Sequence, residues 1–315
     1  MPRFFSPAED NRFSGSVTYL ESLQRLFAQD EGSGLIELQA GEERTVILLL
    51  NAGRSVGSFL VENETVQRFE LVNLARIWSG TTSPIRYMQL PAQAVRAAWQ
   101  ALEWNAGRQA LPADLSPVEI IDMVRVQKAD GMLHLALRDL DGFTMLVDGI
   151  PLSSETILAT PRGFEESLPN FRLTPGAPGS MQASLYPIQA GTLSGDIALL
   201  RLGADSWCSG IIASYQQLVG QSLINALNYD LNTQLRLKRL NLRLVGTRLV
   251  DHQLFTNLDS ATSSYRLVVQ RLVDHTARVV GTGLIRRALG ESYQRLKEPE
   301  RRLLSTRGLA PENFS

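Results

Sequence analysis

The pentapeptide Arg-Leu-Val-Asp-His occurs twice, at Arg248–His252 and at Arg271–His275. Each copy ends in an adjacent carboxylate and imidazole, two groups that bind divalent metals in many proteins. The apolar spacing around both copies predicts helices, in which adjacent side chains point about 100° apart. Neither pair can easily aim both groups at one ion. An inter-helix or inter-subunit polar contact and a solvated face remain the alternatives for Asp251, His252, Asp274 and His275.

Two further residues have side chains that could take part in catalysis. Cys208 lies in the first turn of a predicted helix, where the helix dipole would lower the pKa of its thiol. No histidine stands near it in the sequence, and buried cysteines are common. His134 alternates with apolar residues in a predicted strand, so we expect it to face solvent.

Motifs of the known catalytic and nucleotide-binding loops are absent from the sequence. There is no Gly-x-Ser-x-Gly and no Gly-x-x-x-x-Gly-Lys-Ser/Thr, and Gly281-Thr282-Gly283 lacks the context of a dinucleotide-binding loop. The sequence therefore predicts a protein that is not an enzyme and that has no cofactor, no metal and no catalytic residues.

A basic stretch interleaved with leucine begins near residue 236. This stretch could be an ordinary helix face exposed to solvent. Alternatively, it could bind an acidic protein, an anionic membrane surface or nucleic acid. Few aromatic residues lie nearby and the pI is about 6.4, so we expect no nucleic acid. The favoured partner is an acidic protein, which includes the front half of another copy of the chain. The stretch comprises Arg236, Lys238, Arg239, Arg243 and Arg248.

Composition and charge define the class of protein. The net charge of −1 combines −7 over residues 1–204 (16 Lys and Arg, 23 Asp and Glu) with +6 over residues 205–315 (15 and 9). Opposite charges of this kind favour association between copies, and we expect a homo-oligomer. No apolar run reaches the roughly 18 residues of a membrane span, and no secretory signal is recognisable. These features predict a cytoplasmic protein.

The sequence contains an internal repeat of its expected helices, strands and turns. Leu35–Gly57 predicts two strands and two turns, and an amphipathic helix precedes it. The same order of helix, glycine, strand, polar turn, strand and Gly turn returns over 116–149. Thr18–Leu26 matches Ser116–Val124, and the second turn of the later unit is one residue shorter.

The remaining elements follow from apolar spacing and turn residues. We expect helices at Glu64–Trp78 and Pro91–Gly107, a strand at Ile197–Leu202, and helix caps at Asp205 and Asp259. Leu235–Val245 fits both helix and strand, and helix is favoured. The predicted fold is α+β, with a flexible lead-in at 1–12, units at 13–109 and 110–204 (with a Pro/Gly-rich loop at 160–182), and a basic helical region at 205–315.

The first unit resembles the PATAN domain, a small bacterial module. The resemblance rests on turn glycines and apolar positions in Phe13–Val17, Leu23–Leu26, Ser33–Leu38 and Leu48–Val56, and it extends loosely to about residue 105. A diverged second copy begins at about residue 116. The resemblance implies an interaction module rather than a catalyst.

This resemblance implies a non-enzymatic bacterial signalling adaptor that binds regulatory proteins through its PATAN-like units. The implied partners are a small Ras-like GTPase, a response-regulator receiver or a pilus motor ATPase. The helical region would mediate oligomerisation or a second contact. Two alternatives stay open: a self-assembling structural subunit, and a small-ligand sensor at the interface of the repeats.

Overall fold

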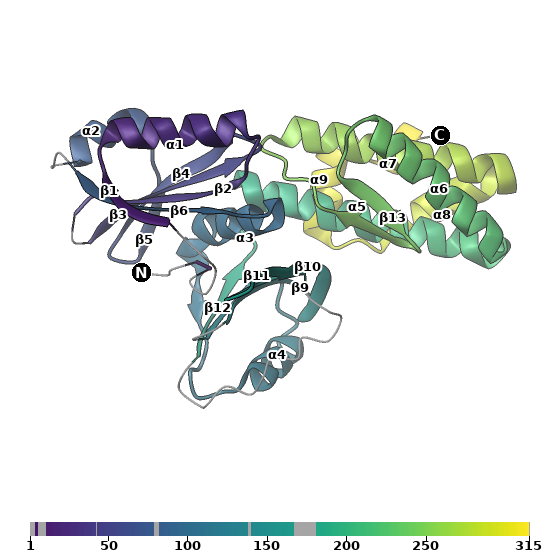
Figure 1. Cartoon of the computed structure of the whole chain (residues 1–315). Coiled ribbons are helices and arrows are strands. Elements are labelled where there is room, and N and C mark those ends of the chain that lie inside the picture. Colours follow the sequence, from purple (N-terminus) through teal and green to yellow (C-terminus); the bar gives the residue numbers. More distant parts are fainter. Residues whose placement is uncertain are drawn as a thin grey trace. The chain divides into compact units, whose positions relative to one another are not determined.

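The computed structural model describes residues 4–5, 11–41, 43–78, 82–137, 140–166 and 181–314. It contains two compact units, Met1–Gln189 and Ala190–Ser315, which we call unit 1 and unit 2 and describe separately (Figure 1). Helices and antiparallel sheets are both present, so the predicted α+β class is correct. Of the expected lead-in, only Phe4 and Phe5 and the start of the first strand are described.

Unit 1 contains a first six-stranded sheet, sheet A, in the order β1-β6-β2-β3-β4-β5. All of its pairings are antiparallel. Together with their helices, these elements form repeat 1. They are β1 (Asn11–Gly15), α1 (Val17–Gln29), β2 (Gly34–Gln39), β3 (Arg44–Asn51), β4 (Arg54–Glu62), β5 (Thr65–Arg68), the 3-10 turn Leu71–Asn73, α2 (Leu74–Ile77) and β6 (Ser83–Gln89).

The helix expected over Glu64–Trp78 is wrong for most of its length. Asn63 and Glu64 both adopt left-handed conformations, with φ of 48° and 67°. Such a pair reverses the chain into a hairpin, and β5 pairs back onto β4. Only the short α2 remains helical.

Repeat 2 contains a second six-stranded sheet, sheet B, in the order β7-β12-β8-β9-β10-β11. This order matches sheet A strand for strand. The elements are β7 (Gln109–Ala110), α4 (Pro117–Val126), β8 (Gly131–Leu137), β9 (Leu140–Val147), β10 (Ile150–Thr160), β11 (Gly163–Glu166) and β12 (Gln182–Pro187). Most of the loop expected at 160–182 lies outside the described residues, and its ends belong to β10, β11 and β12.

Each covering helix is joined to its sheet by the same hydrogen bonds. In repeat 1, the N–H of Gly32 donates to the carbonyl of Phe27 (2.8 Å), and the N–H of Gly53 donates to the carbonyl of Gly32 (2.8 Å). The corresponding bonds of repeat 2 run from Ala129 to Val124 (3.0 Å) and from Gly149 to Ala129 (2.8 Å). The end of each helix is thus held against the tip of its central hairpin.

Gly53 and Gly149 are required at these hairpin tips. Their φ angles are 72° and 73°, and an added Cβ would lie 2.4 Å from Ala28 Cα or 2.3 Å from the Val124 carbonyl oxygen. Both turns have two central residues with positive φ, the geometry that matches the twist of a hairpin. Both turns also have the same length, so the expectation that the second is one residue shorter is wrong.

The two repeats differ in length at the other turn. The β2–β3 turn spans residues 40–43, whereas only 138 and 139 separate β8 from β9. The hydrogen bonds above show that Phe27 of repeat 1 is equivalent to Val124 of repeat 2. The sequence match of Thr18–Leu26 with Ser116–Val124, which aligns Leu26 with Val124, is therefore shifted by one position. Glu119 therefore has its own local role, as the acidic member of the capping box of Ser116.

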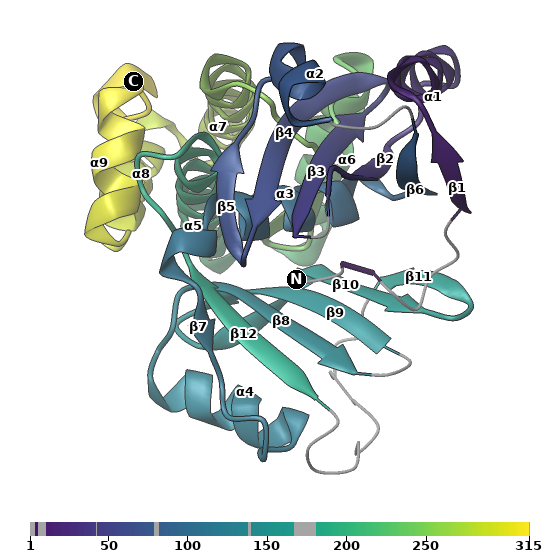
Figure 2. The ribbon, with the colours of Figure 1, turned by 90° about the vertical axis from the view of Figure 1, so that its left-hand side faces the viewer.

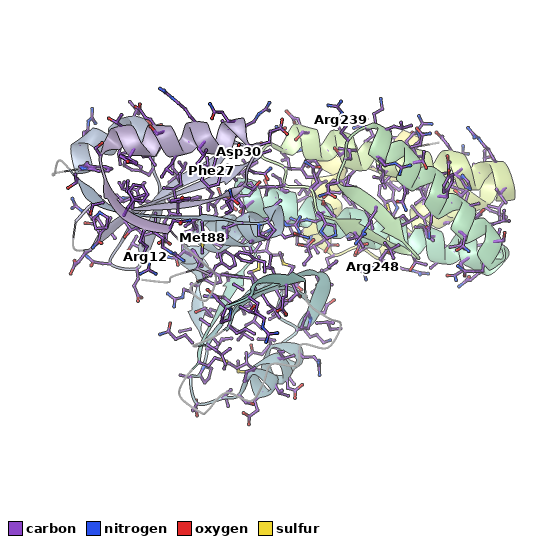
Figure 3. The ribbon with its side chains drawn as sticks, in the orientation of Figure 1. Arg12, Phe27, Asp30, Met88, Arg239 and Arg248 are labelled. Carbon is purple, nitrogen blue, oxygen red and sulfur yellow. The ribbon has the colours of Figure 1, made fainter. Side chains whose placement is uncertain are left out.

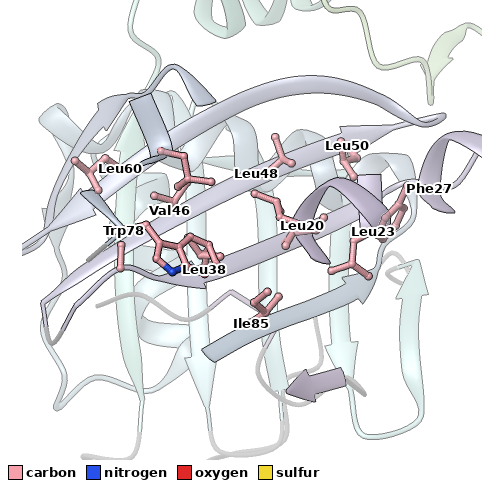
Figure 4. Close-up of a cluster of buried hydrophobic side chains, with 13 residues drawn as sticks. Leu20, Leu23, Phe27, Leu38, Val46, Leu48, Leu50, Leu60, Trp78 and Ile85 are labelled. Carbon is pink, nitrogen blue, oxygen red and sulfur yellow. The ribbon is translucent and has the colours of Figure 1, made fainter. Parts of the chain in front are cut away.

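One face of sheet A packs against α1. Figure 4 shows Leu20, Leu23 and Phe27 of the helix in one apolar cluster with Leu48 and Leu50 of β3. Their spacing of three and four residues is that of a single helix face. In repeat 2, α4 packs on sheet B in the same way, and its contacting residues are Ile120, Ile121 and Val124.

The opposite faces of both sheets contact one helix, α3 (Ala92–Glu103). It contacts β2, β3 and β4 of sheet A and β8 and β10 of sheet B. Figure 2 shows it behind sheet A and above sheet B. Ala94–Leu102 are all buried, as expected for a helix covered on several sides. Arg96 forms an ion pair with Glu155 of β10 at 2.7 Å.

Unit 2 is a helical unit with one small hairpin. The central helix α5 contacts α7, α8, α9 and β14. Within the described ranges, no helix is long and apolar enough to cross a membrane. The elements are α5 (Leu193–Leu218), α6 (Gln221–Leu237), β13 (Leu242–Val245), β14 (Arg248–Asp251), α7 (Leu258–Val280), α8 (Thr282–Gln294), α9 (Glu298–Thr306) and the 3-10 turn Pro311–Phe314.

Several local predictions in this region are wrong. Ile197–Leu202 is helical, because Thr192 caps α5 well before Asp205. Asn257 rather than Asp259 caps α7. Leu235–Val245 divides into the end of α6 and the strand β13, so neither single interpretation holds.

Candidate functional site

The nine residues singled out in the sequence all lie in unit 2, at three separate places. Arg248–Asp251 form strand β14 rather than a helix. In the first Asp-His pair, Asp251 is the last residue of β14 and His252 follows the strand, whereas the second pair lies near the end of α7. The structure does not bring the two pairs together.

Asp251 is buried against the central helix. Its Oδ2 accepts a hydrogen bond from the Tyr265 hydroxyl, and the Nε of Arg201 lies 3.7 Å from the same oxygen. Its Oδ1 accepts the backbone N–H of Gln253 at 2.7 Å. These contacts fix the end of β14 on α5 and α7.

The same hairpin is held one helical turn further along α5 by Asp205. This carboxylate accepts hydrogen bonds from the N–H of Leu249 (2.9 Å) and from Nη2 of Arg248 (2.5 Å). Burial raises the pKa of the Asp205 carboxyl, and the Arg248 charge opposes that change. Arg201, Asp205, Arg248 and Asp251 thus form an alternating set of charges between α5 and the hairpin.

The outer edge of the hairpin is covered by α6. The side-chain amide of Asn232 donates to the carbonyl of Leu244 (2.8 Å) and accepts its N–H (2.6 Å). With its amide turned by 180°, Asn228 pairs in the same way with Gly246. Two asparagines four residues apart on a helix therefore satisfy the backbone of β13 and of the turn that follows it, as a neighbouring strand would.

The remaining cations of the basic stretch are exposed. Arg236, Lys238 and Arg239 lie at the end of α6, where the helix dipole favours positive charge, and Arg243 lies on the outward face of β13. Leu237 among them is 71% exposed. Figure 3 shows Arg239 and Arg248 on opposite sides of unit 2. The predicted basic stretch therefore places exposed cations at two separate positions, the end of α6 and strand β13, while Arg248 is bonded to Asp205.

The other predicted residues make separate polar contacts. Asp274 accepts a hydrogen bond from Gln270 at 2.8 Å. Nδ1 of His275 lies 3.0 Å from Oδ2 of Asp230, which links α7 to α6. The N–H of His252 donates to the carbonyl of Asn241 at 2.9 Å. Among the described residues, no group of three or more His, Cys, Asp or Glu side chains is arranged to hold a metal ion.

Cys208 and His134 differ from their expected settings. Cys208 lies in the middle of α5, fully buried, and burial raises the pKa of its thiol. His134 is also buried, because α3 covers the face of sheet B that was expected to meet solvent. Its Nε2 lies 2.5 Å from Oδ1 of Asp141.

Sequence reasoning missed Arg201 and Asp205 as parts of this network. Their signal was two charges four residues apart among apolar residues in the middle of a helix. Aspartate followed by serine is also a helix-cap pattern, and that interpretation concealed it.

Comparison with known proteins adds no assignment. No family model, curated protein or solved structure matches the chain.

Proposed function

We propose that this chain is a non-enzymatic adaptor of bacterial signalling that binds regulatory proteins through its two repeats. The observation that supports this most directly is the repeated sheet with its covering helix, since both helices expose apolar side chains outward. On α1 these are Tyr19 (57% exposed) and Leu26; on α4 they are Val118 and Val126 (84% exposed). Exposed apolar residues beside polar ones are common at protein interfaces.

The resemblance of repeat 1 to the PATAN domain supports the same proposal. It makes a small Ras-like GTPase, a receiver domain or a pilus motor ATPase the partners to test, in a cytoplasmic setting. The exposed cations at the end of α6 and on β13 would provide the second contact, with an acidic partner.

The proposal is tested with the three candidate partners purified and immobilised. Tyr19→Arg with Leu26→Arg, and separately Val118→Arg with Val126→Arg, place charge on each helix. At least one partner should bind the wild type and lose tenfold or more affinity for one of these variants. Val72→Arg, at an exposed site outside α1, is the matched control. Binding that none of the helix variants changes, or no binding to any candidate, would contradict the proposal.

Self-assembly is the second candidate function. The opposite net charges of residues 1–204 and 205–315 favour it, since they would attract between copies. Light scattering at low and high salt measures the mass directly. A monomer at every salt and protein concentration would exclude it.

A further inference from the structure

One peptide group near the start of the chain is held from both sides inside unit 1. The carbonyl of Phe4 accepts a hydrogen bond from Nη2 of Arg86 at 3.2 Å, and the N–H of Phe5 donates to Oδ2 of Asp141. The carbonyl and the N–H belong to the same amide. Arg86 comes from sheet A and Asp141 from sheet B, so the amide bridges the two repeats.

Both phenylalanine side chains are enclosed by aromatic rings. The ring of Phe143 lies 5.6 Å from that of Phe4 and 5.3 Å from that of Phe5, and Phe164 lies 5.4 Å from Phe5. These separations fall in the range of favourable aromatic pairs. Phe4 and Phe5 are 1% and 0% exposed.

The polar residues of this site are themselves positioned by buried partners. Glu37 lies 2.9 Å from Arg86, and His134 lies 2.5 Å from Asp141 while stacking on Phe143 at 4.2 Å. Burying charges in an apolar layer is costly unless they are paired and hydrogen-bonded. An apolar layer would pack without them. Their presence is explained if the layer must recognise a peptide amide.

The buried partners of Arg86 and Asp141 occupy equivalent positions in the two repeats. Glu37 is the third residue after Gly34 at the start of β2, and His134 is the third after Gly131 at the start of β8. Both side chains lie on the sheet faces that meet α3. Glu37 and His134 thus each hold one of the two residues that contact the amide, Arg86 and Asp141.

The bound segment has the character of a ligand. Phe5 has φ of 60°, a left-handed conformation that is costly for a bulky residue and is kept only where surrounding contacts impose it. Phe4 and Phe5 belong to neither a helix nor a strand. In Figure 2 they are the short purple piece between grey traces, against sheet B and apart from β1.

We propose that the junction of the two repeats is a docking site for a peptide with two consecutive aromatic residues. Phe4-Phe5 occupies it as a resident ligand of the same chain, and a partner segment of the same chemistry competes for it. The surrounding aromatic side chains bind the two rings, and Arg86 and Asp141 form hydrogen bonds with the amide between them. The proposal goes beyond the adaptor function, because it concerns an internal site and does not depend on the outer helix faces.

The test separates the segment from the chain after folding. A specific protease site replaces residues 6–10 in the full-length chain, which is purified and then cut. A fluorescent peptide, Pro-Arg-Phe-Phe-Ser-Pro, is added before and after the cut. The cut chain should bind it saturably, and the uncut chain at least tenfold more weakly, since a short tether holds the resident segment at an effective concentration of the order of millimolar.

Two control peptides define what is recognised. Replacing both phenylalanines by alanine should abolish binding. N-methylation of the second phenylalanine removes the donor to Asp141 while keeping both rings, and should weaken binding tenfold or more.

A variant of the protein serves as a further control. Arg44→Met, which removes only an exposed ion pair with Glu62, should leave binding to the cut chain unchanged.

Three outcomes would overturn the proposal. The cut chain could keep its own segment through extended washing and exchange no labelled peptide, which would make Phe4-Phe5 a permanent part of the core. The segment could leave and the folded chain bind no peptide. The N-methylated peptide could bind as well as the unmodified one, which would show that the amide is not read.

Discussion

The carboxylate of Asp205 on α5 lies 2.5 Å from the guanidinium of Arg248 on β14. The Asp205 side chain is 12% exposed and that of Arg248 is 55% exposed, so the pair closes the outer end of the charge network of unit 2. Asp205 also accepts the N–H of Leu249. This one residue therefore holds both a side chain and the backbone of the hairpin.

Replacing Asp205 by alanine should destabilise unit 2. The change leaves the buried N–H of Leu249 without its acceptor and the Arg248 charge without its partner, a loss of about 2–3 kcal/mol in the free energy of unfolding. Urea unfolding followed by circular dichroism measures it. Arg287→Ala breaks an exposed ion pair of α8 and should leave the free energy of unfolding close to that of the wild type. Equal losses in the two variants would contradict this assignment.

The same carboxyl should make stability depend on pH. Because burial raises its pKa, the folded state holds the proton more tightly than the unfolded state does. The contribution of Asp205 to the free energy of unfolding is therefore fully present below the pKa of the unfolded state, about 3.9. It is lost as the pH rises through the pKa of the folded state. The advantage of wild type over Asp205→Asn should shrink from pH 4 to pH 7. An advantage that grows with pH would mean that Arg248 outweighs burial.

The glycines at the hairpin tips should be sensitive to a single added methyl group. Gly149→Ala places Cβ 2.3 Å from the Val124 carbonyl oxygen as well as forcing alanine into a left-handed conformation. Gly246→Ala has the same backbone problem, with φ of 61°, but meets no atom within 4 Å. We expect about 1 kcal/mol of destabilisation for Gly246→Ala and at least twice that for Gly149→Ala. Thermal unfolding of both variants tests this, and equal effects would show that the helix end moves away freely.

Much of the local structure follows from short-range chemistry. The turn at Asn51–Arg54 and its counterpart at Asp148-Gly149 were recognisable from small and polar residues between apolar runs. The strands on either side, and the helices α1 and α3, follow from apolar spacing. The repeat was recognisable for the same reason, because turn glycines and apolar spacing can be identified within short segments of sequence.

The features that were missed depend on contacts between distant segments. His134 alternates as a surface residue would, and it is buried by segments distant in sequence, α3 and Phe4, that pack on sheet B. Asp205 resembles a helix cap until Thr192 is known to start the helix earlier. Phe4-Phe5 lies 136 residues in sequence from the acceptor of its amide. The spacing of apolar residues within a single helix or strand cannot predict these contacts between distant segments.

The basic stretch should separate into two functions. Arg243 is exposed on β13, whereas Arg248 is bonded to Asp205. Arg236→Ala combined with Arg243→Ala should leave the free energy of unfolding within about 0.5 kcal/mol of wild type, since neither side chain is buried. The same double variant should weaken binding to a ten-residue glutamate peptide several-fold at low salt, and the difference should vanish at high salt. Arg248→Ala should show the reverse, with lower stability and unchanged binding. If Arg248→Ala loses as much peptide binding as the double variant, then Arg248 belongs to the binding surface and its bond to Asp205 is not the dominant state in solution.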